Sequence, residues 1–166
     1  MEITNSGQFL TFTLANDSFA IPIEHVLEVL EVDKITRVPR SKDYLLGVIN
    51  VRGSIRPIID LRTKLHLPPL KDSEQDSINI IVLELEIDNE ISVLGIVTDM
   101  VDKVVTLNND NIDPTPKLGS KLNSRLISGI GKLNDLFLIL LDMDYLFSEE
   151  ANNLKTLELP VTAAPS

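Results

Sequence analysis

Hydrophobic and polar residues alternate over several short stretches of the chain, and turn-forming residues separate these stretches. The clearest example is the segment 47–62, GVINVRGSIRPIIDLR, in which two apolar runs flank the pair Arg52-Gly53. A glycine-containing pair between two such runs is typical of a two-residue turn that joins antiparallel strands. The pattern therefore predicts a β-hairpin with Arg52 at its tip.

The same pattern occurs again in the second half of the chain. Residues 47–65 align without gaps on residues 129–147, with glycine on glycine at the start and aspartate on aspartate after the second apolar run. The expected turn at Arg52-Gly53 falls on Asn134-Asp135, which also suits a tight turn. Because turn, glycine and aspartate positions coincide, the sequence indicates an internal duplication.

A second pair of similar segments supports the duplication, since residues 20–32 align on residues 95–107. A predicted hairpin precedes each segment, with turns around Asn16-Asp17 and around Asp88-Asn89. The apolar spacing at the start of each segment fits either a strand or a short helical turn that runs into a strand. Short helical turns are therefore allowed within 23–30 and within 97–104, and a further helical stretch is expected after residue 142.

Many short strands at regular spacing favour an all-β barrel or sandwich. The polar, proline-containing segment 66–77 is the expected boundary between the two halves, and a second polar loop is expected at 107–124. From Ser148 onward the alternation stops, which predicts a partly helical tail.

Composition agrees with a compact domain in a reducing compartment. Of the 166 residues, 43% are apolar and only 4% are aromatic, so isoleucine, valine and leucine must fill the core. No apolar run has the length of a membrane span, and the first residues lack the pattern of a signal peptide. Cysteine is absent. We expect a soluble cytoplasmic protein.

The charge balance restricts the possible partners. The net charge is −10, which argues against nucleic acid or an anionic membrane as a partner, because both repel a negative surface. A modest basic cluster around Arg37, Arg40 and Lys42 is typical of a solvated face.

Candidate catalytic residues are few. The only histidines, His25 and His66, have no metal-ligand spacing. Two pairs of carboxylates could share a face, namely Asp99 with Asp102 and Asp142 with Asp144, and such pairs can bind a cation or act as acid and base. Helix caps and solvent-facing positions are commoner roles. A small metal-dependent hydrolase remains the alternative from another class, but no metal, cofactor or catalytic residue is predicted.

Four long segments of the chain resemble a known protein family. The segments FTLANDSFAIPIEHVLEVLE, ITRVPRSKDYLLGVINVRGSIRPIIDLR, SVLGIVTDMVDKVVTL and ISGIGKLNDLFLILLDMDYLF are similar to the CheW coupling proteins of bacterial chemotaxis. The similarity runs from about Gln8 to Phe147. It departs from the usual family pattern at Arg40 and Lys42, which puts only the shape of that loop in question.

The resemblance implies a fold and a domain arrangement. We expect two intertwined five-stranded barrels of the SH3-like type, with short helical segments and a C-terminal helical tail. Residues 8–148 would form one CheW-like domain of two pseudo-repeated barrel subdomains, and residues 149–166 would form the tail. The protein is expected to be monomeric alone.

The resemblance also implies a function without catalysis. Family members are scaffolds that link the cytoplasmic tips of methyl-accepting chemotaxis proteins to the regulatory domain of the histidine kinase CheA, a domain that is itself CheW-like. The alternative within the family is an adaptor for a related array that controls pili, gliding or biofilm. The kinase surface is expected on the first barrel and the receptor tip in the groove between the halves. The positions that match residues for receptor binding or signalling are Val26, Glu28, Gly47, Arg52 and Gly95.

The arginines of segment 47–62 receive different predictions. Arg52 is expected to be exposed at the hairpin tip. If the strand stays regular, Arg56, Asp60 and Arg62 share one face, with Arg56 at the surface and Arg62 either functional or in an ion pair, for example with Asp60. Pro57 donates no backbone hydrogen bond, so this strand is expected at an edge or a bulge.

Overall fold

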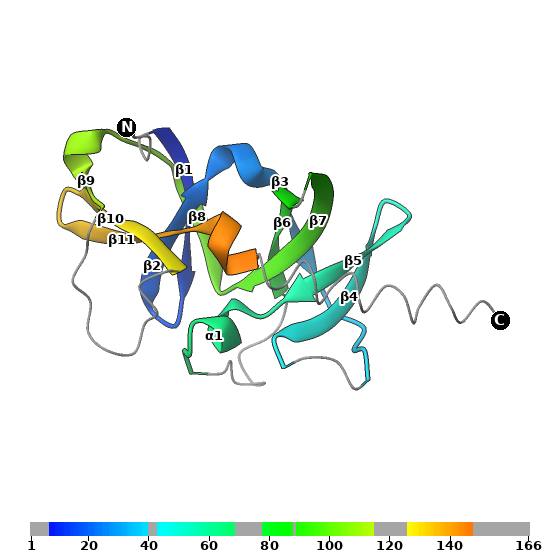
Figure 1. Cartoon of the computed structure of the whole chain (residues 1–166). Helices are drawn as coiled ribbons and strands as arrows, with labels where there is room; N and C mark the ends of the chain where they lie inside the picture. The colour runs from blue at the N-terminus through cyan, green and yellow to red at the C-terminus, as the bar shows by residue number, and fades with distance from the viewer. Residues whose placement is uncertain (1–6, 40–42, 69–77, 88, 115–125, 148–166) are drawn as a thin grey trace.

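The computed structural model describes residues 7–39, 43–68, 78–87, 89–114 and 126–147. Strands dominate these residues, so the prediction of an all-β fold is confirmed (Figure 1). In chain order the strands and the one labelled α-helix are β1 (Gly7–Leu14), β2 (Asp17–Pro22), β3 (Val26–Val32), β4 (Leu45–Val51), β5 (Ser54–Ile59), α1 (Leu61–Lys64), β6 (Ile78–Ile87), β7 (Glu90–Thr98), β8 (Met100–Leu107), β9 (Ile112–Asp113), β10 (Ile127–Leu133) and β11 (Leu136–Leu141).

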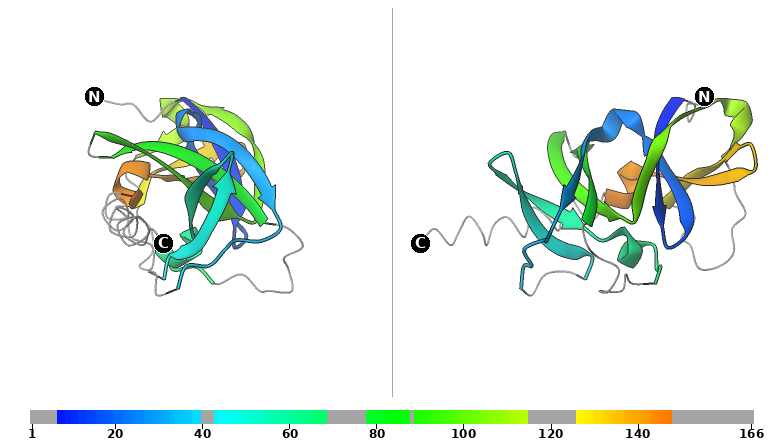
Figure 2. Two further views of the ribbon diagram at one scale, coloured as in Figure 1. Left: turned by 90° about the vertical axis from the view of Figure 1, so that its right-hand side faces the viewer. Right: turned by 180° about the vertical axis from the view of Figure 1, so that it is seen from behind.

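The strands form two sheets, and each sheet draws on both halves of the chain. We call the sheet β8-β1-β2-β11-β10-β9 barrel A and the sheet β3-β6-β7-β5-β4 barrel B. Figures 1 and 2 show the two barrels side by side. Barrel A combines β1 and β2 with strands of the second half, whereas barrel B combines β6 and β7 with strands of the first half. The prediction of two intertwined barrels is confirmed, with the short strand β9 as an addition to barrel A.

Equivalent positions of the aligned segments make equivalent contacts. Strands β5 and β7 pair in parallel with Ile58 opposite Gly95, and β11 and β2 pair in parallel with Leu140 opposite Ala20. In the sequence alignments Ile58 falls on Leu140 and Ala20 falls on Gly95. The two parallel pairings are therefore the same contact made twice, once in each barrel.

Two-residue turns close the hairpins, as predicted. Arg52 and Gly53 have φ values of 54° and 89°, which is the left-handed pair of a type I′ turn. Asn134 and Asn89 likewise have positive φ in their turns. The first hairpin differs from the prediction, because its turn residues are Ala15 and Asn16, one position earlier than expected.

The helical predictions are corrected in part. Within 23–30 only Ile23–His25 is a 3-10 turn before β3 begins, and 97–104 belongs to β7, the Asp99 connection and β8. Helix α1 was not predicted. It begins because the Asp60 carboxylate accepts a hydrogen bond from the backbone N–H of Arg62 at 3.0 Å, which caps the helix and ends β5 at Ile59. The helical stretch predicted after residue 142 is present at 143–147.

Helix α1 also overturns the expected strand face, because Arg62 lies on the helix and no longer alternates with Arg56. The expectation for Pro57 holds in part. Strand β5 lies between β7 and β4, but its pairs with β7 are Ile58 with Gly95 and Ile59 with Ile96. At Pro57 the described pairing is with Val48 of β4 alone.

Some predicted features lie outside the described residues. These are the tail from Ser148, Arg40 and Lys42 of the basic cluster, Asp88, and parts of the two polar segments (69–77 and 115–125). Within the described part of the second polar segment, a 3-10 turn at Asn109–Asn111 and strand β9 stand where an irregular loop was expected.

Three hydrophobic clusters hold the molecule together. One fills barrel A, a second fills barrel B, and the largest lies between the barrels. In this central core, Phe12 of β1 stacks on Phe19 of β2 with ring centroids 5.8 Å apart. The helical stretch 143–147, orange in Figure 1, buries Phe147 in the same core. Since burial of apolar surface is the main stabilising term in folding, the central core joins the barrels into one body.

Candidate interaction site

Two of the predicted residues meet at the tip of the β4–β5 hairpin. Arg52 Nη2 lies 3.2 Å from Glu28 Oε1 of β3. The side chain of Arg52 is 83% exposed and that of Glu28 is 22% exposed. The predicted exposure of Arg52 is thus confirmed, and the structure adds that its guanidinium is held against a strand 24 residues away in sequence.

The backbone at Arg52 is unusual for its residue type. The turn requires left-handed φ, and Asn and Gly adopt this conformation with the least strain. In the pseudo-equivalent turn the corresponding residue is Asn134, with a φ of 56°. A non-glycine residue in a sparsely populated region costs on the order of 1–3 kcal/mol, and such residues cluster at functional sites. Turn chemistry alone therefore does not explain the arginine.

Val26 belongs to the same strand as Glu28 but has a different environment. It is half-buried at the start of β3, opposite Leu83 of β6, and packs against the central core. This contact places the start of β3 at the junction of the two barrels. The neighbouring residues Leu27 and Val29 expose about half of their surface, at 51% and 45%.

Gly47 is buried on β4 and leaves no room for a side chain. Its φ is +156°, and a Cβ built on it would clash with the carbonyl oxygen of Thr36. That oxygen accepts a hydrogen bond from the N–H of Val48 at 2.8 Å, and Thr36 N–H donates to the oxygen of Val48 at 3.0 Å. Gly47 thus allows the segment that follows β3 to pair closely with β4.

Gly95 is buried on β7, opposite Ile58. A Cβ at this position would come within 2.7 Å of side-chain atoms of Ile58 and Ile80, both in the interior of barrel B. The structure therefore brings Arg52 and Glu28 together, places Val26 nearby on the same strand, and puts the two glycines in the packing of barrel B.

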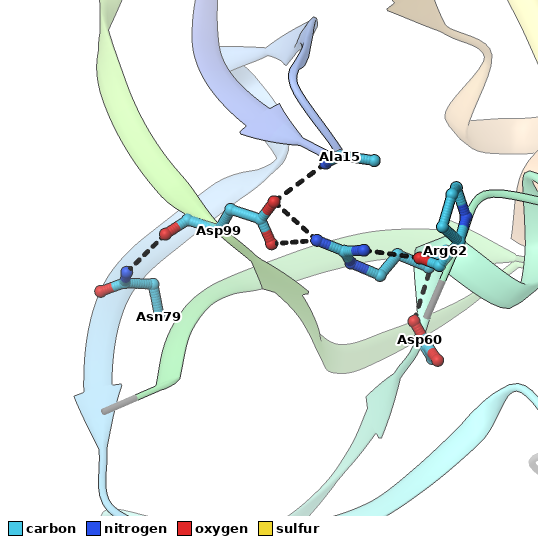
Figure 3. A network of polar contacts seen from close by, with 6 residues as sticks. Ala15, Asp60, Arg62, Asn79 and Asp99 are labelled. Carbon is cyan, nitrogen blue, oxygen red and sulfur yellow. Dashed lines mark hydrogen bonds and ion pairs between the residues drawn. The ribbon is translucent and has the colours of Figure 1, made fainter. Parts of the chain in front are cut away.

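Arg62 forms the predicted ion pair with a different partner. One guanidinium nitrogen of Arg62 lies 2.6 Å from both carboxylate oxygens of Asp99 (Figure 3). Asp60, the expected partner, instead caps α1. Arg56 is partly exposed on β5 and makes no ion pair among the described residues.

The carboxylates considered for catalysis have structural contacts. Asp99 is held by Arg62, Asp102 accepts a hydrogen bond from Thr13 Oγ1 at 3.3 Å, and Asp142 accepts one from the N–H of Tyr145 at 3.1 Å. The part of the chain that the structure describes contains no group of three His, Cys, Asp or Glu residues that could hold a metal ion.

Sequence reasoning missed a set of exposed apolar residues that occupy equivalent positions of the two barrels. Ile55 of β5 and Phe137 of β11 occupy equivalent positions of the aligned hairpins and are 62% and 61% exposed. Val29 of β3 and Val104 of β8 are also equivalent, at 45% and 47%. The duplication could have revealed them, because an apolar residue of one copy falls on an apolar residue of the other at each of these positions.

The two barrels carry different charges beside these apolar residues. Glu28 of barrel B corresponds to Lys103 of barrel A. In barrel A, Lys132 lies 6.0 Å from the centre of the Phe137 ring. Strands β8 and β11 together line an open hollow of about 490 Å³, with contributions from Met100, Val101, Asp102, Lys103, Val105, Leu136 and Leu138, and with Thr11 from β1. The equivalent surfaces therefore present similar apolar residues with different charges.

Two joined barrels that expose apolar side chains and an ion-paired arginine at their ends have the form of a protein-binding adaptor. Comparison with known proteins agrees. Residues 8–151 match the family model described as a CheW-like domain. This chain belongs to the CheW family of chemotaxis scaffold proteins. Among the described helices, none has both the length and the apolar character needed to cross a membrane.

Individual relatives cover most of this chain. The chemotaxis protein CheW of Klebsiella aerogenes is 37% identical over 89% of this chain and 85% of its own length. The chemotaxis protein CheW of Helicobacter pylori is 32% identical over 86% of this chain and 82% of its own. The crystal structure of the scaffolding protein TtCheW from Thermoanaerobacter tengcongensis superposes with a TM-score of 0.71 at 27% identity, covering 86% of this chain and 92% of that one.

Proposed function

We propose that this protein is a non-enzymatic adaptor that couples methyl-accepting chemotaxis proteins to the histidine kinase CheA, in cytoplasmic arrays beneath the inner membrane. Its membership of the CheW family supports the proposal. The observation that carries it is Arg52, an exposed arginine in a left-handed turn position that favours Asn or Gly. Arginine can bind a carboxylate through two parallel hydrogen bonds, which suits a partner surface better than a turn.

The five candidate residues divide into two roles in this proposal. Arg52 and Glu28 contact the receptor directly, since Arg52 is exposed at the hairpin tip and Glu28 of β3 is partly exposed beside it. Val26, Gly47 and Gly95 act through the shape of barrel B, because their neighbours are core residues or backbone. The receptor's helical tip binds beside β3 at the junction of the barrels, where exposed Leu27 and Val29 offer apolar contacts to a helix in a groove.

The first barrel, on which the kinase surface is expected, corresponds to barrel B, which takes three of its five strands from the first half of the chain. We assign the kinase surface to the end of barrel B that contains Ile55. An isoleucine that is 62% exposed next to a two-residue turn is available to the CheW-like regulatory domain of the kinase, in a barrel-to-barrel contact. We further assign residues 8–148 to one domain of two pseudo-repeated barrel subdomains, followed by the tail 149–166. The equivalent parallel pairings in the two barrels support this division. The protein alone is a monomer.

The test is co-sedimentation with a receptor signalling fragment and the kinase, with kinase activity measured in the same sample. Arg52→Asn removes the guanidinium and suits the turn. Its melting temperature should equal that of the wild type or exceed it, because an exposed ion pair contributes only about 0–1 kcal/mol. Kinase activation should be lost, since removal of a charged interface partner typically costs about 2–5 kcal/mol.

Arg56→Asn is the matched control, because it removes the same group from the neighbouring strand at a site without a described ion pair. It should couple receptor and kinase as the wild type does. Normal kinase activation by Arg52→Asn would contradict the proposal. Equal losses in both variants would show that general charge, rather than the hairpin tip, supports coupling.

A further inference from the structure

Asp99 occupies the connection at which the chain passes from one barrel to the other. It lies between β7 of barrel B and β8 of barrel A. Its partner Arg62 lies on α1, directly after β5 of barrel B. The Arg62 side chain is only 10% exposed, and that of Asp99 is 27% exposed. An ion pair this sheltered is less screened than one at the surface, so it constrains geometry more strongly.

The polar groups of Asp99 bond to segments of both barrels, and Figure 3 shows its contacts with Ala15, Arg62 and Asn79. Its carboxylate accepts a hydrogen bond from the N–H of Ala15 at 2.9 Å, and its own N–H donates to the carbonyl of Thr13 at 2.9 Å. Both of these partners belong to the β1–β2 hairpin of barrel A. Its carbonyl accepts from Asn79 Nδ2 of β6, in barrel B, at 3.1 Å. Asp99 therefore connects the two barrels through directional bonds.

Arg62 is fixed at its other end as well. Its second terminal nitrogen, Nη1, donates to the carbonyl of Pro68 at 2.5 Å, so the guanidinium bridges Asp99 and the chain that follows α1. The central core also holds the barrels together, but hydrophobic contact is non-directional. The polar network adds what the core lacks, which is a preferred orientation.

The network occurs at only one of two equivalent places. The alignments put Glu24 at the position of Asp99 and Asp144 at the position of Arg62. Both are carboxylates, which repel each other, and both are exposed. Barrel A forms without an ion pair at the equivalent positions. The Arg62–Asp99 pair is therefore not a general requirement for closing a barrel of this kind.

We propose that Arg62 and Asp99 are positioning residues that fix the angle between the two barrels, and that this angle carries the receptor's signal to the kinase. The second part rests on the proposed function, because it assumes that receptor and kinase bind on different parts of the adaptor. The residues touch neither partner. They act by keeping the β4–β5 hairpin of barrel B in a constant relation to barrel A.

The angle can be measured on the isolated full-length chain. The protein has no cysteine, so the substitutions Ser54→Cys and Asp135→Cys place one spin label on an exposed residue at the hairpin tip of each barrel, at the start of β5 and in the turn before β11. The distance distribution between the labels should be narrow in the parent protein. Asp99→Asn should broaden it or add a second peak, because it removes the charge that holds Arg62. Arg62→Lys keeps the positive charge but loses the several N–H donors of the guanidinium, so the width of its distance distribution should be intermediate.

Asp102→Asn is the matched control, since it makes the same chemical change three residues away on exposed β8. It should leave the distribution unchanged. An unchanged distribution in both Asp99→Asn and Arg62→Lys would overturn the proposal, because the central core alone would then set the angle. If Asp99→Asn fails to fold, the width measured for Arg62→Lys decides: a broadened distribution supports the proposal, and an unchanged one overturns it.

The functional readout separates positioning from simple stability. At a temperature where Asp99→Asn is fully folded, it should bind receptor fragment and kinase separately as the parent does. It should activate the kinase roughly five- to tenfold less in the ternary complex, a loss in the range of typical site-to-site couplings. Full activation with a broadened distribution would overturn the signalling role. If the proposed function itself is wrong, Arg52→Asn will not affect coupling, while the spin-label result still decides the structural part.

Discussion

Gly47 and Gly7 share an unusual backbone conformation but differ in their surroundings. Their φ values are +156° and +143°, in a region that residues with a Cβ rarely adopt. A Cβ at Gly47 would clash with the carbonyl of Thr36, whereas a Cβ at Gly7 would have no atom within 4 Å. The pair therefore separates the cost of the backbone conformation from the cost of the close approach.

Gly47→Ala should lower the free energy of unfolding by at least about 2 kcal/mol more than Gly7→Ala does, because it must also displace the Thr36–Val48 bridge. Urea denaturation measures both values, with the midpoint interpreted only if the slope is unchanged. Equal losses would mean that backbone conformation alone requires glycine at Gly47. In that case the segment after β3 is held by other contacts.

At the scale of elements, the two copies of the repeat end in the same way. Asp60 and Asp142 are equivalent, and each accepts a hydrogen bond from a backbone N–H of the helix that follows. Their own N–H groups donate to the carbonyls of Tyr44 and Leu126, at 2.7 Å and 2.8 Å, again at equivalent positions. Each aspartate thus ends a strand and begins a helix.

Asp60→Ala and Asp142→Ala should each destabilise the protein by about 0.5–2 kcal/mol, which is the usual range for loss of an N-cap. Asp60→Ala should cost more, because Asp60 also accepts a hydrogen bond from Thr63 Oγ1 at 2.9 Å. Serine can still cap a helix, so Asp60→Ser should recover most of the loss in thermal unfolding. A serine variant as unstable as the alanine variant would show that the carboxylate charge is what matters.

The barrel ends permit a test of separate surfaces. Ile55→Asp should abolish kinase binding in a pairwise assay, since a central apolar residue of an interface often contributes about 2 kcal/mol or more, roughly thirtyfold in affinity. Receptor binding should persist. Phe137→Asp alters the equivalent, equally exposed position of barrel A and should leave kinase binding intact. Loss of both partners in a folded Ile55→Asp protein would disprove separate surfaces.

At the scale of the whole molecule, the exchange of strands makes the halves interdependent. Barrel B needs β3, β4 and β5 from the first half around β6 and β7, and barrel A needs β1 and β2 beside β8, β10 and β11. Neither half can close a barrel by itself. The central core, which contains the stacked Phe12 and Phe19, also forms only when the two halves combine.

A fragment of residues 1–72 and a fragment of residues 73–166 should each be unfolded alone and should fold when mixed. Separate fragments leave sheet edges and core faces exposed, and mixing restores them without new covalent bonds. Amide resonances of each fragment, recorded before and after mixing, measure this directly. A dispersed spectrum from either fragment alone would show that strand exchange is dispensable for folding.

Local interactions made much of this architecture predictable. Alternation and turn chemistry act between neighbouring residues, so the hairpin at Arg52-Gly53 and its copy at Asn134-Asp135 could be located from sequence. The similarity of the two copies could be located in the same way. Two local features differ from the prediction. The first turn is shifted by one residue, and α1 appears because Asp60 caps it.

The sequence by itself determined the strands, most turns, the duplication and the exposure of Arg52, since each depends on residues a few positions apart. Only the tertiary structure decided which strands pair across the halves, that Glu28 faces Arg52, and that Arg62 binds Asp99 at a separation of 37 residues in place of nearby Asp60. Several carboxylates were possible partners for Arg62, because any of them would attract the guanidinium about equally at contact distance. The packing of two barrels around one core brings Asp99 within reach and directs Asp60 to its helix.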